Sequence, residues 1–159
     1  MIQDTTFIIC GKEYINQTVG SIKFDKWGEP IACDIRYISH WNDIKNIKLL
    51  KKYVFCLQSG TVFTDINKFF EELPAPLLKT GLGHLVFNKE TNEVYLHDQA
   101  LLIESTMLLG TFNEKKDLLF PNFKCSEQHI HHDYTPLTVM REDGYKTIKT
   151  SKFGQNIIA

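Results

Sequence analysis

The segment His84-Leu-Val-Phe-Asn-Lys-Glu-Thr-Asn-Glu-Val-Tyr-Leu-His97 carries the clearest structural pattern of the chain. Its first part, 85–87, is apolar and strand-forming, and 88–92 is polar and turn-prone. The residues after the turn alternate in polarity, as expected for a strand with one face on a core and the other in water. We therefore predict a β-hairpin with a polar turn and place the rest of the chain around it.

Three segments of the first forty residues also have strand character: 5–10, 20–25 and 31–38. Gly11 follows the first segment. Lys26-Trp27-Gly28-Glu29-Pro30 separates the other two and has turn composition, because glycine permits a positive φ and proline has no N–H for a sheet. These residues are predicted to form an antiparallel β-meander.

Helical periodicity appears in the middle of the chain. Ile66, Phe69, Phe70 and Leu73 share one helical face, and Pro74 follows them, so a helix is predicted over 64–73. A second helix is predicted over about 43–52. The apolar run 100–109 fits either a helix or a buried strand, and we favour the helix.

The C-terminal part predicts a second hairpin, with strands 137–141 and 145–150 joined at Asp143-Gly144. The predicted fold class is therefore α+β. We expect an antiparallel β-sheet or meander with two or three helices, forming a single domain over 1–159.

Composition narrows the functional classes. The chain has 43% apolar and 23% charged residues, which is typical of a globular domain. Its 18 basic and 19 acidic residues nearly balance and form no basic stripe, so we expect no nucleic-acid partner. The N-terminus lacks the pattern of a signal peptide, and no apolar window approaches the roughly 20 residues of a membrane span. We expect a cytoplasmic protein without a membrane partner.

The four cysteines, at 10, 33, 56 and 125, include no Cys-x-x-Cys pair that would indicate a zinc or redox site. Cys10 and Cys56 lie in apolar runs, where a free cysteine behaves as a small apolar residue. Reduced structural thiols are the favoured interpretation, and a catalytic cysteine is the alternative.

The densest chemical cluster is His129-Ile-His-His-Asp-Tyr134. In an extended segment, His129, His131 and Asp133 would share one face and could bind zinc or iron. Their spacing is similar to the start of the metallo-β-lactamase motif, but Tyr134 replaces the further histidine of that motif. This cluster supports an alternative hypothesis of a small metal-dependent hydrolase.

Other catalytic signatures are absent from the sequence, including nucleophile elbows, phosphate loops and zinc-protease motifs. We therefore favour a binding protein that uses no catalytic residue and no cofactor. Carboxylates at the hairpin turn could contact a basic partner, and aromatic side chains could supply binding energy. The candidate partner-binding residues are Glu90, Glu93, Tyr95, Trp27 and Trp41.

The segment Gly83-His-Leu-Val-Phe-Asn-Lys-Glu-Thr-Asn-Glu-Val-Tyr95 resembles a hairpin of small bacterial toxin-immunity proteins, including the YrhB-like group. Asn92 stands where that pattern usually has glycine, and asparagine also tolerates a positive φ. The resemblance implies a small α+β inhibitor that neutralises a toxin domain by direct binding. It assigns no site residue. An accessory protein of a phage or mobile element is a further possibility.

Overall fold

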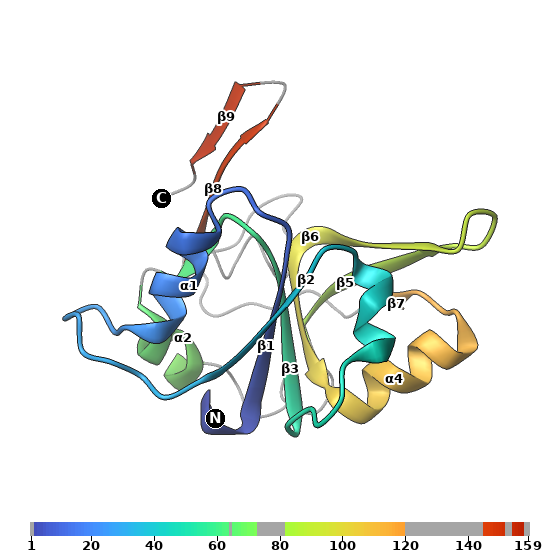
Figure 1. Ribbon diagram of the computed structural model, residues 1–159, viewed down its shortest axis with the longest axis horizontal. Coiled ribbons are helices and arrows are strands. Elements are labelled where there is room, and N and C mark those ends of the chain that lie inside the picture. Colours follow the sequence, from blue (N-terminus) through green and yellow to red (C-terminus); the bar gives the residue numbers. More distant parts are fainter. Residues whose placement is uncertain (1, 64, 73–81, 120–144, 152–153, 158–159) are drawn as a thin grey trace.

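The main sheet brings together strands from distant parts of the sequence, in the order β2-β1-β3-β6-β5-β7 (Figure 1). The structure is a computed structural model that describes residues 2–63, 65–72, 82–119, 145–151 and 154–157. The strands of this sheet are β1 (Thr5–Cys10), β2 (Asp34–Ile38), β3 (Tyr53–Gln58), β5 (Leu82–Asn88), β6 (Glu93–Glu104) and β7 (Leu118–Leu119). The helices of the described residues are η1 (Ile2–Asp4), α1 (Ile15–Lys23), η2 (Trp41–Asn46), α2 (Ile66–Glu72) and α4 (Ser105–Glu114), of which η1 and η2 are 3₁₀ helices.

The first forty residues form a β-α-β unit, so the predicted meander is wrong. β1 pairs in parallel with β2 and, on its other side, with β3. Residues 20–25 were expected to form a strand, but most of them belong to α1. Ile15, Val19 and Ile22 are spaced four and three residues apart and pack on one core cluster, which is the apolar stripe of a helix.

The central hairpin is confirmed. β5 and β6 pair antiparallel from Leu85 with Leu96 to Asn88 with Glu93, and a four-residue turn joins them. β6 continues beyond the hairpin and pairs antiparallel with β3. It therefore joins the hairpin to the parallel strands.

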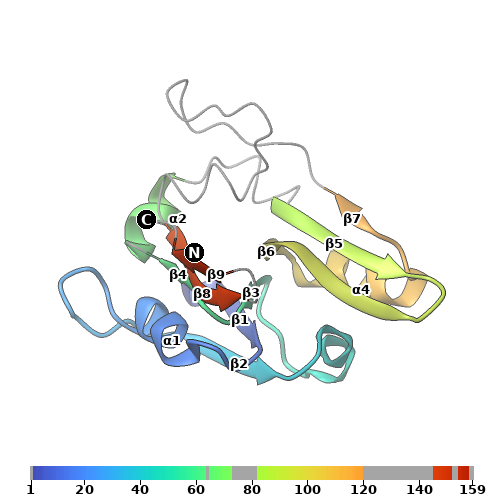
Figure 2. The same cartoon turned by 90° about the horizontal axis from the view of Figure 1, so that it is seen from above.

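Both faces of the sheet are covered by helices (Figures 1 and 2). α1 and α2 pack on one face, where Phe7 and Phe55 stack with ring centroids 5.9 Å apart. η2 and α4 pack on the opposite face, through Ile44 and Leu108. β1 is buried along its whole length because both of its faces are covered.

Two other helix predictions need correction. In place of the helix expected over 43–52, the structure has only the short 3₁₀ helix η2 (Trp41–Asn46). The backbone is extended from Ile47. The run 100–109 was expected to be helical, yet its first half lies in β6 and the helix begins only at Ser105. The helix predicted over 64–73 is confirmed as α2.

A second sheet contains β4 (Thr61–Phe63), β8 (Tyr145–Ser151) and β9 (Gly154–Ile157), paired antiparallel. β8 falls on the predicted strand 145–150, whereas the partner strand predicted over 137–141 lies outside the described residues. The α+β class is confirmed, with a main sheet that is mixed. None of the described helices has the length and apolar character needed to cross a membrane.

Candidate functional site

Trp27, one of the predicted partner-binding residues, is 78% exposed in the loop between α1 and β2. This loop has a defined backbone. Asp25 Oδ1 accepts hydrogen bonds from the main-chain N–H groups of Trp27 and Glu29, each 2.8 Å long. Asp25 N–H in turn donates to Glu29 O over 2.9 Å, and Gly28 takes a φ of 83° to complete the turn. The loop thus holds an exposed indole on an ordered backbone.

Side-chain contacts also tie this loop to the body of the protein. Lys26 Nζ lies 3.5 Å from a carboxylate oxygen of Asp65, next to the start of α2. The same ammonium lies 4.9 Å from the centroid of the Trp27 ring, a cation–π geometry. At the base of the loop, the main chain forms an isolated antiparallel β-bridge between Phe24 and Pro30. The side chain of Phe24 is 47% exposed.

Trp41, another predicted partner-binding residue, is a core residue and is excluded from the candidate site. It is 4% exposed and belongs to the core cluster between η2 and the sheet. Its indole Nε1–H donates to Gln58 Oε1 over 3.3 Å, so the polar end of the ring is also satisfied inside the protein.

The other three predicted residues gather at the β5–β6 hairpin. Glu90 and Glu93 are exposed at the turn, and Tyr95 is 49% exposed on β6. Asn88 Oδ1 accepts from the N–H groups of Glu90 and Thr91, at 3.0 and 3.3 Å. These hydrogen bonds within the turn explain why its sequence is rich in short polar side chains.

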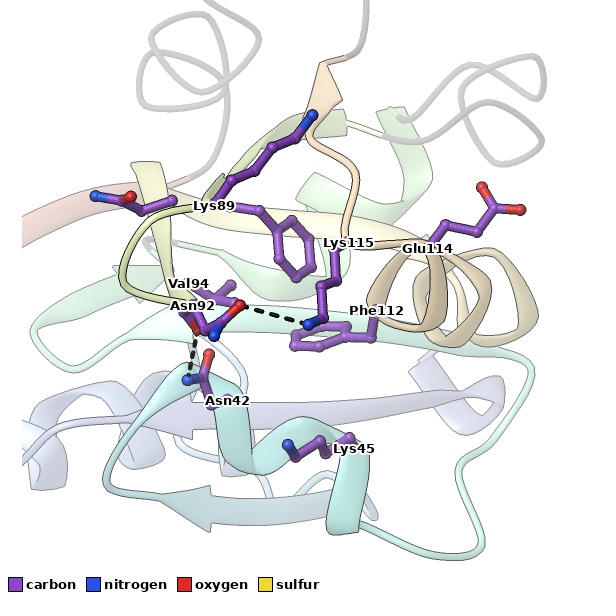
Figure 3. Close-up of a pocket in the computed structure, with 10 residues that line it drawn as sticks. Asn42, Lys45, Lys89, Asn92, Val94, Phe112, Glu114 and Lys115 are labelled. Atoms are coloured by element: carbon purple, nitrogen blue, oxygen red, sulfur yellow. Dashed lines mark hydrogen bonds between the residues drawn. The ribbon is translucent and has the colours of Figure 1, made fainter.

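A groove of about 510 Å³ lies beneath this turn (Figure 3). Its apolar part includes Phe87 and Phe112, whose ring centroids are 5.1 Å apart in an edge-to-face arrangement. The groove is lined by Asn42 and Lys45 of η2, by Phe87, Asn88, Lys89, Asn92 and Val94 of the hairpin, and by Phe112, Glu114 and Lys115 at the end of α4.

Hydrogen bonds join the three walls of the groove. Asn42 Nδ2–H donates to Asn92 O over 3.0 Å, and Lys115 Nζ lies 3.5 Å from Asn92 Oδ1 (Figure 3). Asn42 Oδ1 is buried and has no hydrogen-bond partner in the described part of the chain. Asn92 therefore connects η2 and α4 through the hairpin turn.

Lysine outnumbers carboxylate around the groove, which we did not expect from the sequence. Three lysines line it, and its one carboxylate, Glu114, is 3.1 Å from Lys116 in an exposed ion pair. Glu90 and Glu93 thus stand beside basic residues, and the hairpin end is mixed in charge. Such a surface is more complementary to a partner surface that carries both acidic and basic groups than to a uniformly basic partner surface.

The predicted partner-binding residues do not form one surface. The loop between α1 and β2, which carries Trp27, lies at one end of the protein, and the β5–β6 turn lies at the opposite end (Figures 1 and 2). A small partner domain that contacts one end leaves the other uncovered. Sequence reasoning missed the groove because η2, the hairpin and α4 are far apart in the chain.

The described cysteines are poor nucleophiles. Burial, assisted by the nearby carboxylate of Asp43, raises the pKa of Cys10 to about 11. Burial also raises the pKa of Cys56 and, to a smaller extent, that of Cys33. These thiols stay protonated near neutral pH, which fits a structural role.

The predicted metal ligands His129, His131 and Asp133 lie outside the described residues. Among the residues that the structure describes, no group of three or more His, Cys, Asp or Glu side chains is placed to hold a metal ion.

No family model matches the chain, and no curated protein matches it.

Proposed function

We propose that the chain is a binding protein that inhibits a protein partner, such as a toxin domain, by direct contact, and that Trp27 is the centre of this contact. The observation that carries the proposal is the 78% exposure of an indole on an ordered loop. Water-exposed tryptophan is unfavourable in a free protein, whereas tryptophan is among the residues that dominate binding energy at interfaces.

The order of the loop supports the same conclusion. A side chain on a flexible loop loses conformational freedom when it binds, and this loss weakens the complex. Here Asp25 and Gly28 define the backbone, and Lys26 is tied to Asp65. Most of the ordering cost is therefore met during folding, which favours tight binding through a small contact.

The chemistry of the loop indicates the kind of partner. Trp27 and Phe24 are exposed apolar groups, and Lys23, Lys26 and Glu29 are exposed around them. This arrangement of an apolar centre with a charged rim is typical of protein interfaces. We infer a protein partner with an apolar pocket for the indole.

The proposal is tested by affinity capture from cells that naturally produce the chain, with wild type, Trp27→Ala and Tyr95→Ala as baits. Tyr95→Ala is the matched control, since it removes an exposed aromatic side chain at the opposite end of the protein. The partner should be retained by wild type and Tyr95→Ala and lost from Trp27→Ala. A hot-spot tryptophan is worth at least about 2 kcal/mol, so Kd should rise by at least about thirtyfold.

Inhibition is then measured with the purified partner, whose toxic or enzymatic activity should fall in a stoichiometric titration with the chain. Equal retention of the partner by all three baits, or full partner activity in the complex, would overturn the proposal.

The metal-dependent hydrolase remains an alternative that rests on His129, His131 and Asp133 alone. Elemental analysis of wild type and of His129→Ala/His131→Ala tests it directly. About one zinc or iron per chain, lost in the double variant, would favour the hydrolase over the inhibitor.

A further inference from the structure

At the carboxyl ends of β1 and β2 the chain leaves the sheet toward opposite faces. The chain leaves β1 into α1, which packs on one face of the sheet, and leaves β2 into η2, which packs on the opposite face. Where the connections of neighbouring parallel strands separate in this way, a crevice opens beyond the strand ends, and it is the usual ligand site of open α/β sheets.

A cleft of about 820 Å³, open to solvent, lies at this position. Its volume falls within the range of small-molecule sites. It is lined by Gly11, Lys12 and Ile15 after β1, by Tyr37, Ile38 and Ser39 at the end of β2, and by Asp43, Asn46 and Ile47 in and after η2. The cleft thus lies where the connections after β1 and β2 separate.

Hydrogen bonds fix the strand ends that border the crevice. Gly11 N–H donates to Ile38 O over 3.2 Å and joins the end of β1 to the end of β2. On the other side of β1, Cys10 O accepts from Ser59 N–H and from Gln58 Nε2, each at 2.9 Å. The two strand ends therefore have fixed positions before any ligand binds.

The lining carries two charges of opposite sign. Neither the ammonium of Lys12 nor the carboxylate of Asp43 forms an ion pair or side-chain hydrogen bond with the residues that the structure describes. The effect of Asp43 on the pKa of Cys10 indicates that its charge lies close to the end of β1. Ile15, Ile38 and Ile47 provide the apolar part of the lining.

We propose that this crevice binds a small zwitterion with an apolar side group, the chemistry shared by an apolar α-amino acid and a short apolar peptide. The ligand ammonium pairs with Asp43, and its carboxylate pairs with Lys12. Its apolar group contacts the three isoleucines. Burial of that group supplies affinity, while the two charges select against ligands that lack either one.

The experiment titrates the full chain with small-molecule probes. Binding is measured by calorimetry and by the NMR chemical shifts of the Gly11 and Ser39 amides. The probes are L-leucine and leucyl-leucine, compared with N-acetyl-leucine, which lacks the ammonium, and leucinamide, which lacks the carboxylate. Saturable binding of a zwitterion is expected, with affinity at least about tenfold weaker for both capped analogues. Leucine and leucyl-leucine distinguish the free amino acid from the peptide as the source.

Asp43→Asn and Lys12→Gln should each weaken zwitterion binding by at least about tenfold. Asp43→Asn keeps the size of the side chain, and Lys12→Gln shortens an exposed side chain. Neither breaks a described hydrogen bond, so the variants should fold as wild type does. Lys89→Gln and Glu93→Gln at the hairpin end are the matched controls and should bind normally. Absence of saturable binding by both zwitterions, equal binding of the capped analogues, or unchanged binding by Asp43→Asn would overturn the proposal.

Discussion

Gly11 faces Ser59 so closely that a Cβ added to the glycine would stand 2.5 Å from Ser59 Oγ. Gly11 also has a φ of 109°, a conformation that side chains other than hydrogen rarely allow. Two separate constraints therefore require glycine at the end of β1, where the chain turns toward α1. This residue sets the geometry of the strand ends and tolerates no ordinary substitution.

Gly11→Ala should lower the free energy of unfolding by about 2 kcal/mol or more, because it adds backbone strain and a steric overlap. In a chain of this size Tm should fall by at least about 4 °C. Gly20→Ala is the matched control. Gly20 lies within α1 with nothing within 4 Å of the added Cβ, so alanine should raise stability by about 0.5 to 1 kcal/mol. Thermal unfolding of the three proteins decides; an unchanged Tm in Gly11→Ala contradicts the expectation.

The two tryptophans should report opposite environments. With Trp27→Phe, the emission comes from buried Trp41 and should be blue-shifted and resistant to acrylamide. With Trp41→Phe, it comes from exposed Trp27 and should be red-shifted and readily quenched. Trp27→Phe should change stability by less than about 0.5 kcal/mol, since surface substitutions rarely do more. A similar quenching constant in both variants would contradict the placement of either indole.

Asp34 should make the free energy of unfolding decrease at acidic pH. Burial tends to raise its pKa, but hydrogen bonds from Arg36 and Thr6, together with the positive charges of Arg36 and Lys51, outweigh burial and lower the pKa from the ordinary value of 3.8. Because the folded carboxyl has the lower pKa, its ionised form stabilises the fold above pH 3.8, and this contribution is lost as the pH falls through the folded pKa.

Asp34→Asn removes the titrating group and should cost on the order of 1 kcal/mol at neutral pH, with little cost in strong acid. Urea unfolding of wild type and Asp34→Asn, from neutral pH to strong acid, measures the difference in their free energies of unfolding. A constant difference at every pH would show that Asp34 does not account for any acid lability. Glu71→Gln, on an exposed part of α2, serves as the control.

The buried thiols should resist alkylation until the protein unfolds. With the pKa of Cys10 raised from 9.0 to about 11, its thiolate fraction near neutral pH is about a hundredfold lower than that of an ordinary cysteine. Cys10 and Cys56 should therefore react with iodoacetamide at least about a hundredfold more slowly in the native protein than in urea. Peptide mass mapping gives the rate for each site, and comparable native and unfolded rates at Cys10 would contradict its burial.

The sequence predicted the elements whose signals are local. The β5–β6 hairpin has its strands and turn in one short segment, and α2 has its apolar face, start and stop within ten residues. Both predictions are confirmed, as is the α+β class. The predicted carboxylates and Tyr95 do lie at an exposed hairpin end, but their role as partner contacts stays a prediction.

The errors have physical causes. Ile22 and Phe24 alternate as in a strand, and this hid the helical spacing of Ile15, Val19 and Ile22. The parallel pairing of β1 with β3 joins residues far apart in the chain and leaves no local signal. At 100–109 the sequence changes from strand to helix within one apolar run, so no single period describes it. Trp41 was predicted as a partner-binding residue because the sequence alone does not distinguish a core indole from an exposed one.

The position of β3 has a consequence for how the protein is made. β3 pairs with β1 on one side and with β6 on the other, and β6 ends at Glu104. A ribosome therefore completes β3 well before it completes the strand that covers its open edge. During this interval an apolar strand offers unpaired N–H and C=O groups to other nascent chains. Slower translation between Gln58 and Glu104 would lengthen this exposure and increase aggregation, although the finished protein would be unchanged.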